Sequence, residues 1–177
     1  MKALIVYGTR YGSAAEISQK IGNILRKENV EVDVVDSKGS INCDITPYDL
    51  VIVGSGIKIG SWTKPALKFM EKHENELKDK KVALFVSCSA NRDEKSIKEA
   101  KEKYLDNVAD KYLKNPPVAS GLFGGVIDPN AKLGLMDKVI FKMVKKDLES
   151  KGIDTSKPYD TRDWDQIHKW AQDLIKN

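Results

Sequence analysis

The chain has 177 residues, of which 41% are hydrophobic and 32% charged, and 30 basic against 26 acidic side chains give it a net charge of +4. This length predicts one domain over residues 1–177, and no apolar stretch reaches the about 18 residues that span a bilayer. The mild, dispersed positive charge argues against a nucleic-acid partner. Two cysteines without a C-x-x-C pair exclude a disulfide scaffold and, with no signal peptide, predict a reducing, cytoplasmic location.

The first fourteen residues predict a buried strand that leads directly into a helix. Residues 3–7 are apolar on both faces, which is typical of a central strand in a parallel sheet. The chain then passes through Gly8 to Ser13, and from Ala14 its apolar residues recur at helical spacing. Because the start of a helix presents N–H groups without intrahelical partners and the positive end of a dipole, this loop predicts an anion site, most often for phosphate.

The loop sequence excludes two common phosphate-binding motifs. It is neither the G-x-x-x-x-G-K-[ST] loop of nucleoside triphosphate enzymes nor the G-x-G-x-x-G fingerprint of dinucleotide-binding proteins. A plain strand-to-helix turn with a serine cap remains the alternative at this point.

The rest of the chain alternates strands with helices. Further strands are expected over residues 30–36, 50–53, 82–86 and 118–127. One helix is expected to start at residue 63, and a second, long one to follow the loop 87–91 and end at about residue 114. Two more are expected over 133–151 and 163–176. Residues 37–47 are polar and too short for a good helix. The helix over 133–151 has a broad apolar face, expected to pack on the domain, with docking to a partner or a membrane as the alternative.

This order of elements predicts an α/β fold. We expect a three-layer sandwich in which a five-stranded parallel sheet, in the order 2-1-3-4-5, carries helices on both faces. The second strand alternates polar and apolar residues and is assigned to the edge. The ligand crevice of such a sheet lies beside the ends of strands one, three and four, which lead into the small-residue loops 8–14, 54–62 and 87–91.

Several other chemistries are excluded. A phosphoacceptor domain of two-component signalling needs acidic residues where this chain has Gly8-Thr9 and Gly54-Ser55. There is no G-x-S-x-G motif, and the two histidines lie within predicted helices, His73 at a boundary or the surface. No metal-ligand cluster is present, so neither a catalytic residue nor a metal site is assigned. Cys88 ends a predicted strand and is interpreted as a buried thiol, with a reactive thiol as the alternative.

The loop at 9–14 resembles the phosphate loop of flavodoxins, S/T-x-T-G-x-T, with Thr9, Gly12 and Ser13 in matching places. Over nearly its whole length the chain resembles a flavodoxin-fold protein, and its layout is similar to the menaquinone-dependent protoporphyrinogen dehydrogenase branch of that superfamily. The residues that carry this likeness are Tyr-Gly-Thr-Arg-Tyr-Gly at 7–12, the segment 54–60 with Lys58 where that branch has Arg, the helix 133–151, and Asp-Trp-Asp-Gln at 163–166. The chain departs from the branch at 128–132, which replaces an aromatic and basic run.

The resemblance implies a noncovalently bound FMN. The implied phosphate-binding residues are Thr9, Arg10, Tyr11, Gly12, Ser13 and Ala14. The residues implied to flank the isoalloxazine ring are Ser55, Gly56, Ile57, Lys58, Ile59, Gly60 and Trp62 in the second loop, and Ser87, Cys88, Ser89, Ala90 and Asn91 in the third. Gly124 and Gly125 are expected to allow close backbone approach. Trp62 is the aromatic candidate for the ring edge, with core packing as its alternative.

The resemblance also implies a function in electron transfer. The first expectation is an FMN-binding flavodoxin that carries electrons between redox partners such as ferredoxin-type iron–sulfur proteins. The alternative is an enzyme, an FMN-dependent oxidoreductase of the protoporphyrinogen dehydrogenase type that passes electrons to a quinone. A third hypothesis is an FMN-binding protein without independent activity.

Overall fold

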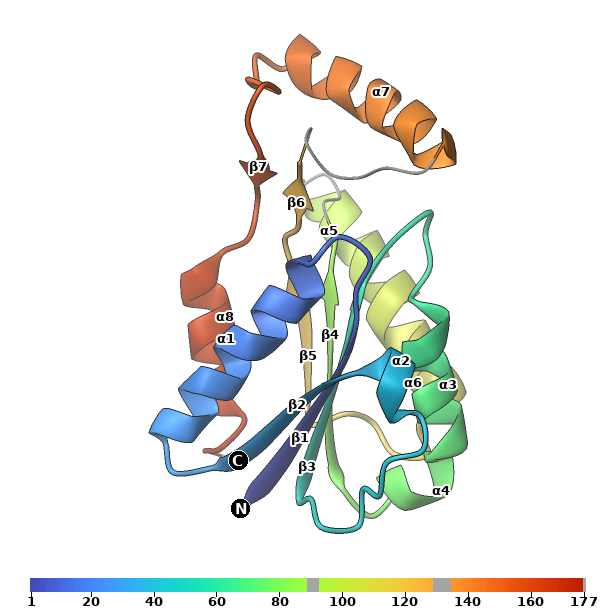
Figure 1. Cartoon of the computed structure of the whole chain (residues 1–177), viewed down its shortest axis with the longest axis vertical. Coiled ribbons are helices and arrows are strands. Elements are labelled where there is room, and N and C mark those ends of the chain that lie inside the picture. Colours follow the sequence, from blue (N-terminus) through green and yellow to red (C-terminus); the bar gives the residue numbers. More distant parts are fainter. Residues whose placement is uncertain (89–92, 129–134, 177) are drawn as a thin grey trace.

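The protein, seen in a computed structural model that describes residues 1–88, 93–128 and 135–176, is built on one parallel sheet (Figure 1). The five strands of this sheet lie in the order β2-β1-β3-β4-β5 and pair in parallel. Their bounds are Lys2–Gly8 for β1, Glu31–Asp36 for β2, Leu50–Gly56 for β3, Lys81–Ser87 for β4 and Ala119–Phe123 for β5. The predicted fold class and strand order are therefore confirmed.

Helices cover both faces of the sheet, which explains why the central strands are apolar throughout. On one face Ile5 and Ile52 pack against α1 (Ser13–Lys27) and α8 (Trp164–Asp173). On the other face Leu4, Val51 and Val53 belong to a second apolar cluster, which a second group of helices covers. The elements on that side are α3 (Lys64–Lys72), α4 (Glu74–Leu77), α5 (Glu94–Lys101), the π-helical segment η1 (Glu102–Asp106) and α6 (Asn107–Tyr112).

The fifth strand is shorter than predicted, because it divides at two glycines. β5 ends at Phe123, and β6 (Val126–Ile127) pairs instead with β7 (Tyr159–Asp160) in an antiparallel ribbon. Gly124 lies so close to the following segment that a Cβ atom on it would stand 2.0 Å from the Thr161 carbonyl oxygen. The close backbone approach expected at Gly124 is thus made to the protein's own residues 161–162.

Three smaller expectations differ from the structure. Ser37–Ser40 form a single helical turn, α2, because the Asp36 carboxylate accepts the Lys38 N–H at 2.9 Å and caps it. The long helix up to about residue 114 is interrupted by η1. His73, expected at a boundary or the surface, is 5% exposed, and its Nε2 lies 3.1 Å from the Ile41 carbonyl oxygen.

The helix predicted over 133–151 is present as α7 (Leu135–Ser150), and Leu133 lies outside the described residues. Figure 1 shows α7 beyond the carboxyl ends of the sheet strands, where the β6–β7 ribbon leads. Val139 and Met143 are 63% and 70% exposed, so this part of the predicted apolar face is not covered by the domain. Among the described helices, none has the length and apolar character needed to cross a bilayer.

Candidate functional site

The carboxyl ends of β1, β3 and β4 lie side by side and bring three predicted loops together. Gly8 of β1 is in register with Ser55 of β3, and Gly56 of β3 is in register with Ser87 of β4. The loops that leave these strands enclose a small pocket of ≈ 60 Å³, which we call the loop pocket. It is lined by Thr9, Arg10, Tyr11, Ser13, Ala14, Gly56, Ile57, Lys58, Ser87, Gly125 and Val126.

Ten of these eleven lining residues are ones that the sequence had singled out, and Val126 is the addition. A cavity of about 10–15 Å³ is enough for one water molecule. The pocket is therefore of the size of a small group such as a phosphate, and any larger ligand has to extend over the loops that border it.

The first turn of α1 faces this pocket without a side-chain cap. Gly12 is the capping residue, with φ +96°, a left-handed conformation that favours glycine, and it has no side chain to bond the first-turn N–H groups. Its own N–H donates to the Thr9 hydroxyl oxygen at 3.0 Å, which shapes the loop. The N–H groups of Ser13, Ala14 and Ala15 come before the first i→i−4 bond and have no intrahelical acceptor, so this end of α1 is suited to an anion.

Other predicted residues lie outside the loop pocket. Ser55 is buried, and its hydroxyl oxygen accepts the Thr63 N–H at 2.9 Å. Ile59 has φ +47° and is 66% exposed at the tip of the second loop, and Gly60 follows it. Cys88 is half-buried, and its N–H donates to the Phe123 carbonyl oxygen at 3.0 Å. Ser89, Ala90 and Asn91 lie outside the described residues.

Trp62 packs in the core instead of standing at the crevice. It is 5% exposed, and its indole N–H donates to the Tyr104 carbonyl oxygen in η1 at 2.7 Å. The bond and the burial explain why the second loop is drawn against the π-helical segment. The aromatic side chain that borders the loop pocket is Tyr11, which is 46% exposed and has the Lys58 ammonium 5.6 Å from its ring centroid.

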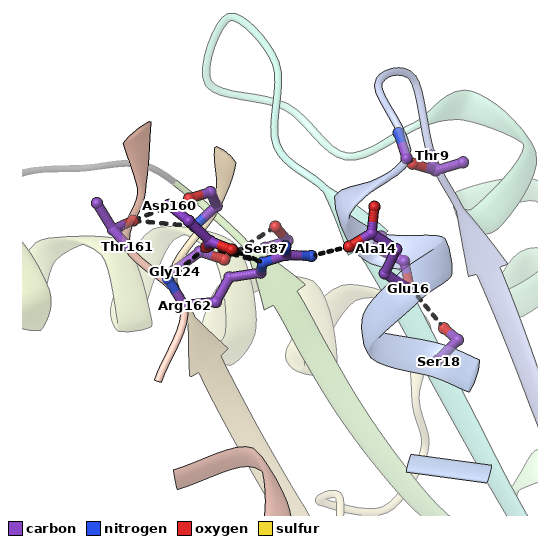
Figure 2. Close-up of polar contacts among 11 residues, drawn as sticks. Thr9, Ala14, Glu16, Ser18, Ser87, Gly124, Asp160, Thr161 and Arg162 are labelled. Atoms are coloured by element: carbon purple, nitrogen blue, oxygen red, sulfur yellow. Dashed lines mark hydrogen bonds and ion pairs between the residues drawn. The ribbon is translucent and has the colours of Figure 1, made fainter. Parts of the chain in front are cut away.

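A buried arginine beside the site was missed by the sequence reasoning. Arg162, whose side chain is 7% exposed, bonds Glu16 in the first turn of α1 at 2.6 Å and Asp160 of β7 at 2.7 Å (Figure 2). Its hydrogen bonds hold the pKa of Asp160 below the ordinary value. The neighbouring Thr161 hydroxyl bonds the Gly125 backbone at 3.0 Å. Residues 160–162 therefore join the segment after β5 to the start of α1. These contacts link residues far apart in sequence, and no local motif predicts them.

A second and larger pocket lies on the other side of the first loop. Its volume is ≈ 440 Å³, and we call it the lysine pocket. It is lined by Gly8, Thr9, Arg10, Tyr11, Ser37, Lys38, Lys58, Thr63, Lys64 and Pro65. Sequence reasoning did not assign Ser37, Lys38, Thr63 or Lys64 to a site. It considered only the loops that leave β1, β3 and β4, and it ended the second of these loops at Trp62. The predicted strand order could have found Ser37 and Lys38, since it places the end of β2 beside that of β1.

The chain has recognisable relatives. The family profile described as "Flavodoxin domain" matches residues 4–155. A protein named protoporphyrinogen IX dehydrogenase (quinone) from Escherichia coli strain K12 is 25% identical over 179 residues, which cover 98% of this chain and 94% of that protein. A protein of the same name from Leishmania major is also 25% identical, with 98% of this chain and 74% of that protein covered.

Solved structures share the fold at lower identity. Oxidised flavodoxin 1 from Bacillus cereus superposes with a TM-score of 0.61 at 16% identity, covering 100% of this chain and 99% of that one. Flavodoxin 2 from the same organism gives a TM-score of 0.58 at 18% identity, with 99% of each chain covered. At this identity the likeness establishes the shared architecture alone.

Proposed function

The chain belongs to the flavodoxin domain family, which implies a flavin, and on that premise we propose that it binds FMN noncovalently and transfers electrons between redox partners. The observation that carries this proposal is the start of α1. It opens without a side-chain cap into a pocket of phosphate size, at the point where the ends of β1, β3 and β4 meet. A flavin with a phosphate group suits this arrangement better than one without.

In this proposal the residues of the first loop hold the phosphate. The N–H groups of Ser13 and Ala14 and the hydroxyl of Ser13 donate to it, and the Thr9 hydroxyl keeps Gly12 in its left-handed conformation while donating its own proton. The bound cofactor supplies one- and two-electron chemistry at its ring. Gly56, Ile57, Lys58 and Ser87 come from the second and third loops, line the same pocket and are proposed to position that ring.

A second candidate function is supported by the two relatives that match nearly the whole of this chain. Both carry a name that specifies protoporphyrinogen IX as the substrate and a quinone as the acceptor. By analogy with them, we propose as the alternative an FMN-dependent dehydrogenase that reduces a quinone.

The proposed cytoplasmic location agrees with Cys43 and Cys88, which are both free thiols.

The visible spectrum of the purified protein tests the shared part of both proposals. We expect flavin absorbance, and the cofactor released by heating should co-migrate with FMN rather than FAD or riboflavin. A colourless protein that takes up no added FMN would rule out both functions.

The two functions are separated by their electron acceptors. The reduced protein is mixed in a stopped-flow instrument with an oxidised ferredoxin or with a water-soluble naphthoquinone. A carrier transfers electrons to the iron–sulfur protein within one turnover and shows no saturable quinone reduction. Steady-state turnover with the quinone and protoporphyrinogen IX would instead support the dehydrogenase.

A further inference from the structure

We propose that the lysine pocket is a second anion-binding site, one that takes a small organic anion with two or more acid groups. It is separate from the loop pocket. Ser37, Lys38 and Lys64 line only the lysine pocket, whereas Ser13 and Ala14 line only the loop pocket. Its volume of ≈ 440 Å³ lies within the range of about 300–1,000 Å³ that is typical of small-molecule clefts.

The charge of the lining residues determines the sign of the ligand. Arg10, Lys38, Lys58 and Lys64 line this pocket, and no aspartate or glutamate is among its described lining residues. The nearest acidic residue in sequence, Asp36, uses its carboxylate to accept the Lys38 N–H of α2. For a chain whose acidic and basic side chains are nearly balanced in number, this is a strongly one-sided local charge.

A buried hydroxyl in the pocket wall provides an independent observation. Ser37 is fully buried, and its Oγ has no hydrogen-bond partner among the described residues. A buried polar group without a partner is costly, and most such groups in native proteins are satisfied. An anionic oxygen in the lysine pocket supplies the missing acceptor for this hydroxyl.

The start of α3 adds backbone donors. This helix of nine residues begins at Lys64, and the Thr63 side chain does not cap it. Instead the Thr63 hydroxyl oxygen lies 3.3 Å from that of Ser55, under Gly8, where a Cβ atom would stand 1.7 Å from it. Pro65 in this turn has no N–H, so the N–H groups of Lys64 and Ala66 are the ones left without an intrahelical acceptor. The positive end of the helix dipole lies at Lys64 and Pro65, which line the lysine pocket.

The size of the pocket and the number of cations favour more than one acid group. A single phosphate would meet the Ser37 hydroxyl and the α3 start but would leave most of the ≈ 440 Å³ and some of the four cations unused. Lys58 and Tyr11 line both pockets, so the second site lies directly beside the proposed flavin site.

Titration calorimetry with inorganic pyrophosphate and with citrate, at low salt, tests the proposal. Each probe is titrated into the protein with and without saturating FMN, so that the loop pocket is filled in one series. We expect saturable one-to-one binding of at least one probe in the FMN-saturated series, weakening as KCl is added. In the FMN-free series the loop pocket is also open, so binding there should be at least as strong. If neither pyrophosphate nor citrate binds saturably in the FMN-saturated series, the proposal is overturned.

Variants assign the bound probe to one pocket. Lys38→Gln with Lys64→Gln should weaken probe binding about tenfold or more, because charge-assisted bonds are lost. The matched control, Lys20→Gln with Lys68→Gln, removes the same charge from exposed positions outside both pockets and should change affinity less than twofold. Equal losses in the two double variants, or a loss caused only by Ser13→Ala, would overturn the assignment.

Ser37→Ala gives a check that does not depend on charge. It should weaken probe binding several-fold without lowering the melting temperature of the probe-free protein, since the hydroxyl makes no bond there. Unchanged probe affinity in this variant would contradict the role of Ser37. The FMN-free titrations and the variants do not require FMN. If the protein binds no FMN, they still decide whether the lysine pocket holds the probe, so failure of the proposed flavin function can be told apart from failure of this proposal.

Discussion

Helices α1 and α8 pack on the same face of the sheet and begin at the same end of it, yet their first turns are completed in opposite ways (Figure 1). The start of α8 is closed by its own chain, since the Asp163 carboxylate accepts the N–H groups of Asp165 and Gln166 at 3.0 and 2.9 Å. The start of α1 has glycine in the same capping position and no side-chain bond.

This difference separates a structural helix start from one available to a ligand. A side-chain cap such as that of Asp163 stabilises a protein by about 0.5–2 kcal/mol. Helix α1 has no such cap and lacks this contribution. The uncapped end opens into the loop pocket, and the capped end does not line it. We therefore interpret the α1 start as the place where a bound phosphate takes the role that Asp163 has in α8.

The largest expected effect comes from placing a carboxylate at the α1 start. Ser13→Asp should weaken FMN binding by at least about a hundredfold, because a like charge within 4 Å costs up to about 4 kcal/mol at an effective dielectric near 20. The FMN-free variant should unfold at the same or a slightly higher urea concentration, since an acidic residue in the first turn favours the helix dipole.

The control for this change is Ser13→Asn, which has nearly the same shape and no charge. Fluorescence titration with FMN measures both variants. If Ser13→Asp and Ser13→Asn lower affinity equally, charge at the α1 start is not what determines binding.

A smaller loss is expected from Thr9→Ala. The Thr9 hydroxyl accepts the Gly12 N–H, and in our proposal it also donates to the phosphate. A charge-assisted hydrogen bond contributes about 1.5–3 kcal/mol, so FMN should bind about tenfold to a hundredfold more weakly. Fluorescence titration measures the affinity for FMN, and an unchanged affinity would show that the Thr9 hydroxyl does not bind the phosphate.

The converse change at the other helix start is Asp163→Ala. Removal of the cap should lower the free energy of unfolding by about 1 kcal/mol, while the affinity for FMN stays within twofold of the parent. Urea denaturation followed by circular dichroism measures the first quantity and FMN titration the second. A large loss of FMN affinity here would show that the two helix starts are not functionally distinct.

The smallest effect concerns the cation beside the α1 start. Lys58 lines the loop pocket, and a positive charge near the ring favours the more negative, reduced cofactor. With exposure reducing the interaction to about 1 kcal/mol, Lys58→Met should lower the potential of the second electron by on the order of 40 mV. Dye-coupled titration at low salt measures this potential. No change, or a rise, would show that the charge of Lys58 does not act on the bound cofactor.

Much of the fold could be predicted from sequence, because the central strands are buried on both faces and are read as continuous apolar runs. The first loop could be predicted for a similar reason, as Gly12 and Ser13 follow a strand and precede a helix within a few residues. Trp62 could not be placed, since its core position depends on the carbonyl of Tyr104, which lies 42 residues later. Arg162 was missed because its partner Glu16 is 146 residues away.

The most direct test of the central claim compares FMN with riboflavin, which has the same ring and lacks only the phosphate. Both are titrated into the flavin-free protein under the same conditions. If the uncapped start of α1 holds the phosphate, FMN should bind at least about a hundredfold more tightly, which corresponds to one or two charge-assisted hydrogen bonds. Equal affinities for FMN and riboflavin would contradict the account.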